Sequence, residues 1–142
     1  MQSKNHANKY TKMIGNSFLL DTNIIIALLK GESLIAEKID KAENIYIPVI
    51  VIGELYYGSL YSSSSKKNFE VVERLARRYN ILQIDEAAAR SYGSIKTVLR
   101  KKGTPIPEND IWIAALAQHH ELIIVTRDKH FREVESVHIE NW

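Results

Sequence analysis

Four of the 17 acidic residues combine a useful side chain with a position that would hold it in place: Asp21, Glu54, Asp110 and Asp128. Asp21 and Asp128 each follow a short apolar run typical of a buried strand. Asp110 opens a strongly apolar helical segment, which would keep its carboxylate close to the core. Because ligands of open parallel sheets bind beyond the carboxyl ends of the strands, acids at these ends can converge on one crevice.

Glu54 does not follow a strand, and we select it as a candidate because the residues around it are apolar. It lies within segment 49–61, which is apolar on most sides, so we expect this helix to be largely buried. An ionised glutamate in such a helix is costly unless it is paired or bound to a cation. The competing explanation is that Glu54 occupies the one solvated stripe of the helix.

Carboxylates that converge in one crevice repel each other, and a hard divalent cation relieves that repulsion. Oxygen ligands suit Mg²⁺ or Mn²⁺, and Mg²⁺ is usually held by a few carboxylates together with substrate phosphate. We therefore predict a site for phosphodiester hydrolysis whose catalytic residues and metal ligands are Asp21, Glu54, Asp110 and Asp128. The polar neighbours that would orient these carboxylates or contact phosphate are Thr22, Asn23, Asn109 and Thr126.

Each acid also has a purely structural explanation. Asp21 and Asp110 are of a type often found as N-caps, and Asp128 would also suit a cap or a turn. Asp85 shows that position alone does not identify a catalytic acid, because it too follows a strand and starts a helix; we interpret it as an N-cap. A receiver domain is excluded because it needs two acids where Asp21 stands alone. A haloacid-dehalogenase-type phosphatase is excluded because it needs aspartate at Asn23.

The bulk composition is that of a soluble domain. The 142 residues are about one domain long, with 45% hydrophobic and 25% charged residues. Absence of cysteine excludes disulfides and thiolate metal sites, and it is consistent with a cytoplasmic location. No apolar run approaches the ~18 residues of a membrane span. Residues 1–16 lack the apolar core of a signal peptide, so we expect a disordered or poorly structured leader before a single domain at 17–142.

Short apolar runs that alternate with helical segments predict an α/β fold. We expect strands at 18–20, 45–47, 81–84, 122–126 and 137–139. We expect helices at 24–30, from a Ser33 cap through 39, and at 49–61, 66–79, 85–103 and 108–119. Right-handed crossovers between such units produce a parallel sheet covered on both faces, so the predicted fold is a three-layer α/β/α sandwich.

Four short motifs carry the selected acids in a fixed order. They are Leu20-Asp21-Thr22-Asn23, Glu54-Leu55-Tyr56-Tyr57-Gly58, Pro107-x-Asn109-Asp110-x-x-Ile113-Ala114-Ala115 and Thr126-x-Asp128-x-x-Phe131. With the closing Glu140-Asn141-Trp142, they resemble PIN-domain nucleases, in particular the VapC toxins of bacterial toxin–antitoxin pairs. The resemblance covers about residues 17–142, and the ordered set is a much stronger signal than any single motif.

This resemblance implies a central parallel five-stranded sheet with the first strand in the middle and the crevice beside the first and fourth strands. It also implies a Mg²⁺- or Mn²⁺-dependent endoribonuclease that hydrolyses tRNA or another structured RNA. The implied partners are the RNA substrate, a cognate antitoxin whose C-terminal segment covers the active-site groove, and a second copy of the chain in a homodimer. The alternative is a catalytically inactive PIN-like module that binds RNA or a protein partner.

Basic residues are gathered in clusters, although the net charge of +2 permits a nucleic-acid partner without requiring one. The cluster best placed to contact an RNA backbone is Arg127, Lys129 and Arg132, beside Asp128. A solvated helix face explains any one cluster equally well. The histidines beyond residue 100 show no metal-ligand spacing, and only His130 is close enough to Asp128 to line the groove.

Overall fold

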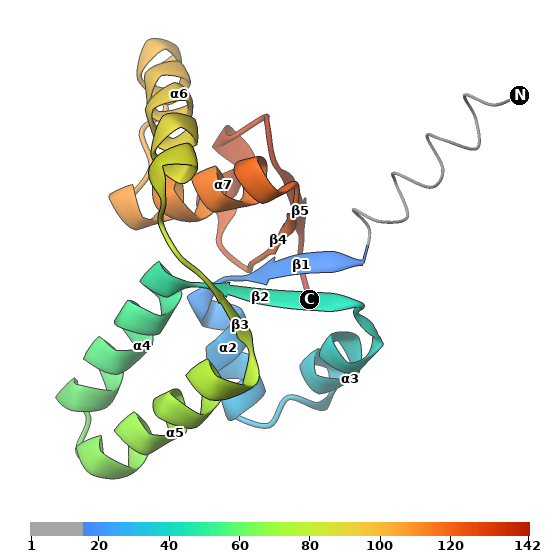
Figure 1. Cartoon of the computed structure of the whole chain (residues 1–142), viewed down its shortest axis with the longest axis vertical. Coiled ribbons are helices and arrows are strands. Elements are labelled where there is room, and N and C mark those ends of the chain that lie inside the picture. The colour runs from blue at the N-terminus through green and yellow to red at the C-terminus, as the bar shows by residue number, and fades with distance from the viewer. Residues whose placement is uncertain (1–15) are drawn as a thin grey trace, which may run out of the picture.

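The computed structural model describes residues 16–142, so the predicted leader lies outside the described residues apart from Asn16. Its elements are β1 (Ser17–Leu20), α2 (Thr22–Leu29), α3 (Ser33–Lys41), β2 (Asn44–Pro48), α4 (Val49–Tyr61), α5 (Ser65–Arg78), β3 (Asn80–Leu82), α6 (Glu86–Lys102), α7 (Glu108–His120), β4 (Ile123–Val125), the 3₁₀ helix η1 (Lys129–Glu133) and β5 (His138–Glu140) (Figure 1). The predicted boundaries agree with these to within about two residues.

The five strands form one parallel sheet in the order β3-β2-β1-β4-β5. β1 lies in the middle, where Phe18 is opposite Ile45 of β2 and Leu20 is opposite Val125 of β4. Helices α2 to α5 lie on one side of the sheet, and α6 and α7 lie on the other (Figure 1). The predicted three-layer α/β/α sandwich with a central first strand is therefore confirmed.

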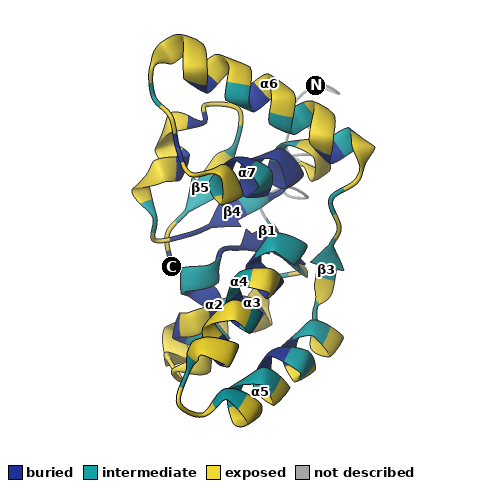
Figure 2. Cartoon of the chain, turned by 90° about the vertical axis from the view of Figure 1, so that its left-hand side faces the viewer, coloured by how far each residue is buried: buried dark blue, intermediate teal, exposed yellow. Residues whose placement is uncertain are grey.

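The two central strands and α7 form the best-buried part of the molecule (Figure 2). Leu19 and Leu20 of β1 and Ile124 and Val125 of β4 are fully buried, as expected for a parallel sheet covered on both faces. The middle of α7 is also buried, because it packs between the sheet and α6. Within residues 16–142, no helix is both long and apolar enough to span a membrane.

The prediction that α4 is largely buried is wrong for its second half. Val51, Ile52 and Leu55 are buried near the sheet, but Tyr57 is 70% exposed and Tyr61 is 84% exposed. The reason is that α4 runs away from the end of β2 and leaves the sheet, so that beyond the sheet its main neighbour is α5 (Figure 1). The apolar residues of α4 therefore lie on both its core-facing side and its exposed side.

Pro48, the last residue of β2, is also the N-cap of α4. One predicted helix start needs correction. Glu32, rather than Ser33, occupies the N-cap of α3, and its side chain makes no capping hydrogen bond. By contrast, the Asp85 carboxylate accepts a hydrogen bond from the Ala88 amide at 2.9 Å, which confirms its interpretation as a cap.

Phe131 ties η1 to the core and provides a test of this architecture. Its side chain is fully buried, so the change Phe131→Ala should lower the free energy of unfolding by about 3–5 kcal/mol in urea denaturation. The neighbouring Arg132 is exposed, and Arg132→Ala should change that free energy by less than about 0.5 kcal/mol. Equal losses in the two variants would contradict the placement of Phe131 in the core.

Candidate active site

The selected acids meet where the strand order reverses, beyond the carboxyl ends of β1 and β4. Asp21 directly follows β1, and Asp128 lies between β4 and η1. Asp110 lies in the first turn of α7, and Glu54 lies in the middle of α4. The chain leaves β1 for β2 on one side and returns to β4 on the other, so this crevice is the position expected for a ligand.

Asp21 is the most buried of the four, with 5% of its surface exposed. Its Oδ1 accepts a hydrogen bond from the Thr22 amide at 2.8 Å, and its Oδ2 accepts one from the Thr126 hydroxyl at 2.7 Å. Burial raises the pKa of Asp21, and the Asp128 charge acts in the same direction, while the two hydrogen bonds oppose them. Asp21 therefore caps α2 and forms part of the acidic crevice at the same time.

Thr126 links the ends of the two central strands. Its buried hydroxyl donates to Asp21 and accepts a hydrogen bond from the Asp128 amide at 2.9 Å. The Asn23 side-chain amide lies 3.4 Å from both the Thr126 hydroxyl and Asp21 Oδ2. One compact set of hydrogen bonds thus joins Asp21 and Asn23 to Thr126 and Asp128, which lie in a distant part of the sequence.

Glu54 joins the same group from the opposite side of the crevice. Its Oε2 accepts a hydrogen bond from the Thr22 hydroxyl at 3.1 Å, and its Oε1 accepts one from the Asn109 amide group at 3.4 Å. Glu54 is therefore connected to the residue that follows Asp21 and to the residue that precedes Asp110. All four predicted polar neighbours, Thr22, Asn23, Asn109 and Thr126, donate a hydrogen bond to one of the selected acids.

Asp110 is not an N-cap, because Pro107 occupies that position of α7. The capping explanation is therefore wrong for Asp110, whereas Asp128 does cap η1 by accepting from the His130 amide at 2.9 Å. Burial, followed by the charges of Asp21 and Asp128, raises the pKa of Asp110 to about 6. His130 opposes this increase but does not cancel it.

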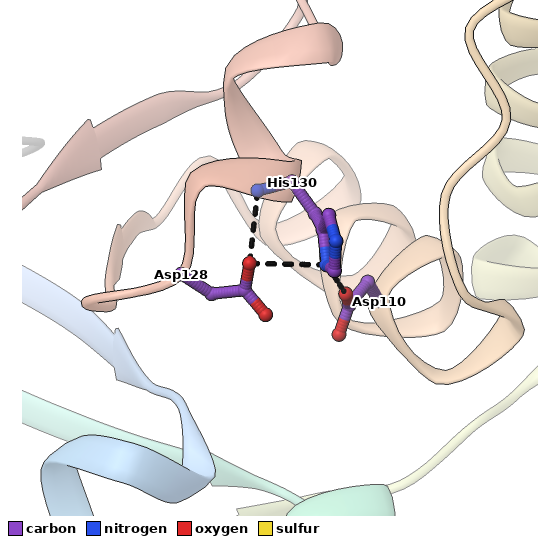
Figure 3. A group of neighbouring side chains, drawn as sticks. All are labelled: Asp110, Asp128 and His130. Atoms are coloured by element: carbon purple, nitrogen blue, oxygen red, sulfur yellow. Dashed lines mark hydrogen bonds and ion pairs between the residues drawn. The ribbon is translucent and has the colours of Figure 1, made fainter.

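His130 is the one site residue that the sequence patterns did not identify as a ligand. Its Nδ1 lies 3.2 Å from Asp110 Oδ2 and 3.0 Å from Asp128 Oδ1, and the three side chains point toward one another (Figure 3). One donor atom from each lies within 4.8 Å of the other two, so the group could hold a metal ion. The available signal was the Asp-x-His spacing, which only the tight 3₁₀ turn of η1 converts into proximity.

This donor set fits a hard divalent cation. Asp21 and Asp110 both have a raised pKa, and in each case burial and a neighbouring carboxylate disfavour the ionised form. A bound cation would offset both effects, because its charge favours the ionised carboxylates. Carboxylate oxygens also suit Mg²⁺ and Mn²⁺. Asp110, Asp128 and His130 are the residues whose donor atoms lie close enough together to hold an ion. Asp21 and Glu54 are linked to the same crevice by hydrogen bonds through Thr126, Thr22 and Asn109.

The three basic residues beside Asp128 differ in their surroundings. The Arg127 guanidinium makes an ion pair with Glu32 at 2.9 Å and also donates to the backbone carbonyl of Trp142 at 3.1 Å. Lys129 and Arg132 lie on the exposed surface of η1. Contacts between these side chains and RNA stay a prediction, for which Lys129 and Arg132 are better placed than Arg127.

The sheet order and the acidic crevice together define a PIN-type α/β domain. The family model described as PIN domain matches residues 18–137, and the chain therefore belongs to the PIN-domain family. This confirms the family that the four sequence motifs indicated.

Similar proteins match along nearly their whole length. Ribonuclease VapC2 of Haemophilus influenzae is 36% identical over 128 residues, which cover 88% of this chain and 97% of that protein. The tRNA(fMet)-specific endonuclease VapC of Salmonella typhimurium is 34% identical over 128 residues, with the same coverage of both chains. The solved structure of DNA-bound VapBC from Salmonella typhimurium has a TM-score of 0.81 and 32% identity, covering 89% of this chain and 98% of that one.

The raised pKa of Asp110 predicts a pH-dependent difference in stability. An aspartate with a folded pKa of about 6 and an ordinary value of 3.8 destabilises the fold as pH rises between these values. In chelator at about pH 8, Asp110→Asn should therefore melt roughly 5 °C above the unmodified protein, and this difference should vanish near pH 4. A difference that is the same at both pH values in thermal denaturation would contradict this electrostatic account.

Proposed function

We propose that this protein is a Mg²⁺- or Mn²⁺-dependent endoribonuclease that acts as the toxin of a toxin–antitoxin pair. The observation that carries the proposal is the convergence of Asp21, Glu54, Asp110 and Asp128, linked by hydrogen bonds, at the carboxyl ends of the central strands. The VapC ribonucleases that match this chain over most of its length support the same activity.

The acids have distinct parts in this proposal. Asp21 and Asp110 would be the main ligands of the cation, directly or through water, while Glu54, Asp128 and His130 would complete the site or orient water. A divalent ion held there would supply an activated water and stabilise negative charge on the phosphate. Thr126 keeps Asp21 and Asp128 in register, because its hydroxyl bonds to both of them. Hydrolysis by water leaves a 5′-phosphate and a 3′-hydroxyl and does not need the 2′-hydroxyl of RNA.

The substrate is proposed to be tRNA or another structured RNA, as the name of the Salmonella typhimurium relative suggests. Lys129 and Arg132 would contact the phosphate backbone beside Asp128, because both are exposed on η1. A catalytically inactive module that only binds RNA or protein is not favoured. Such a module has no need for the grouped carboxylates Asp21, Asp110 and Asp128, where burial and neighbouring charges raise the pKa of Asp21 and Asp110.

Cleavage of bacterial RNA by the purified protein tests this function directly. With Mg²⁺ or Mn²⁺ we expect discrete cuts with 5′-phosphate ends, and chelator should abolish them. Asp21→Asn and Asp110→Asn should reduce the rate by at least about 100-fold, because each removes a charge that holds the cation. The matched control is Asp85→Asn, which changes an aspartate that also follows a strand but only caps α6.

Three results would contradict the nuclease proposal. They are cleavage that persists in chelator, full activity in both the Asp21→Asn and Asp110→Asn variants, and products that end in a 2′,3′-cyclic phosphate. Asp85→Asn should retain normal cleavage, because asparagine also serves well as an N-cap. Equal loss in Asp85→Asn would mean that the effect of these substitutions is structural.

The proposed antitoxin has a suitable surface next to the site. A groove of about 400 Å³ runs between α2, α4 and α5, and its lining includes Ile26, Leu29 and Gly58 as well as Thr22 and Glu54. Ile26 is 40% exposed and Leu29 is 46% exposed, so the groove presents apolar surface that continues to the acids. A segment bound there would block access to the site. The VapBC complexes among similar structures support such a partner, and the homodimer stays a prediction.

A charge placed in this groove should release the toxin from inhibition. Leu29→Asp puts a carboxylate where an apolar antitoxin side chain would pack, so inhibition should require at least about tenfold more antitoxin. Cleavage by the free variant should be unchanged. Leu34→Asp is the matched control, because Leu34 is 57% exposed on α3 and does not line the groove. Equal inhibition of both variants would mean that the antitoxin binds elsewhere.

A further inference from the structure

We propose that Arg127 is a positioning residue, which holds the turn carrying Thr126 and Asp128 in its catalytic arrangement. The inference rests on the proposed nuclease function and assigns Arg127 a part different from the RNA contact that its charge suggests. The residue lies between two site residues, and its backbone amide and its side chain are bound by different partners. We call this arrangement a clamp. Its inner anchor is the bond from the Arg127 amide to Asn23, and its outer anchor is the pair of guanidinium bonds to Trp142 and Glu32.

The inner anchor is the backbone of the turn. The Arg127 amide donates to Asn23 Oδ1 at 3.1 Å, and Asn23 also contacts Asp21 through its side-chain nitrogen. On either side of Arg127, the Thr126 hydroxyl bonds to Asp21 and the Asp128 amide bonds to the Thr126 hydroxyl. These bonds face the acidic crevice, so any shift of the turn moves Asp128 relative to Asp21.

The outer anchor is the guanidinium of Arg127. Its Nε donates to the backbone carbonyl of Trp142 at 3.1 Å, and its Nη2 pairs with Glu32 at 2.9 Å. Glu32 lies 95 residues before Arg127 in the sequence, and Trp142 lies 15 residues after it. A planar guanidinium presents its donors in a fixed fork, so two bonds to separate partners restrict its position more than one bond would.

The carbonyl that accepts from Arg127 belongs to a residue that is itself fixed. Trp142 is 8% exposed, and its ring meets Phe18 of β1 edge-on with 5.0 Å between the ring centres. Its indole nitrogen donates to Glu140 at 2.9 Å, and the Lys38 ammonium lies 5.8 Å from the ring centre. The clamp is thus fastened to the central strand and to β5, rather than to a loose chain segment.

The same contacts argue against an RNA contact by Arg127. Glu32 already neutralises its charge, and the Arg127 side chain is only 40% exposed. Binding a phosphate would mean giving up bonds that hold the turn. Lys129 and Arg132 lie exposed within a few residues and provide positive charge without that loss. Positioning and RNA binding therefore make opposite predictions for Glu32.

The experiment compares Arg127→Ala and Glu32→Gln. Glu32 makes no capping hydrogen bond, so Glu32→Gln removes its charge without removing a cap. If Arg127 positions the turn, Arg127→Ala should lower kcat about 10- to 100-fold with KM within about twofold, and Glu32→Gln should lower kcat in the same direction. Hydrogen exchange at the backbone amides of residues 127 and 128 should be at least about tenfold faster in Arg127→Ala than in the unmodified protein. Arg127→Lys should restore part of kcat by pairing again with Glu32.

An RNA contact would give the opposite pattern. Arg127→Ala would then weaken RNA binding in chelator and reduce its logarithmic salt dependence by about one, while Glu32→Gln would leave binding equal or stronger. That result, or amide exchange unchanged by Arg127→Ala, would overturn the proposal. The matched control is Arg90→Ala, which removes an exposed arginine–glutamate pair at 2.8 Å in α6 and should alter neither kcat nor these amides. Because exchange needs no cleavage, an inactive unmodified protein would refute the nuclease function while still testing the clamp.

Discussion

The hydrogen bond from the Thr126 hydroxyl to the buried Asp21 carboxylate is the interaction on which the site depends most. It is 2.7 Å long, lies in the interior and joins residues that directly follow β1 and β4. Because these strands are neighbours, the bond also fixes where each chain segment leaves the sheet. Asp128, Asn23 and the start of η1 are all placed relative to this one contact.

This bond lies in a crevice where keeping the neighbouring carboxylates ionised is energetically costly. Burial is the largest penalty on the ionised forms of Asp21 and Asp110, and the charges of neighbouring acids add to it. Hydrogen bonds to Asp21 and the His130 ring beside Asp110 relieve part of that penalty. The remaining repulsion is tolerated because the surrounding fold holds the acids in place, and it leaves them prepared for a cation.

The sequence was enough to predict the fold class, the order of elements and the convergence of the selected acids, whose catalytic roles stay a prediction. Apolar runs identify buried strands, and acids that directly follow the central strands, as Asp21 and Asp128 do, lie at one edge of a parallel sheet. His130 was not recognised as a possible ligand, because its contact with Asp110 spans 20 residues and depends on the tight turn of η1. Likewise, nothing local reveals that Arg127 pairs with Glu32, which lies 95 residues away in sequence. The exposed half of α4 was misjudged because an apolar pattern does not distinguish a core face from a surface face.

The central position of β1 has a consequence for how the domain is made on the ribosome. Among the described strands β1 is synthesised first, yet its β4 neighbour follows only after β2, β3 and six helices. The hydrogen bond between Asp21 and Thr126 cannot form until Thr126, 105 residues further along the chain, has been synthesised. Such non-local pairing forms late, since the intervening chain must be ordered first. A growing chain that already contains Asp21 and Glu54 therefore lacks the arrangement that the proposed nuclease needs, so RNA beside the ribosome is not exposed to a complete active site.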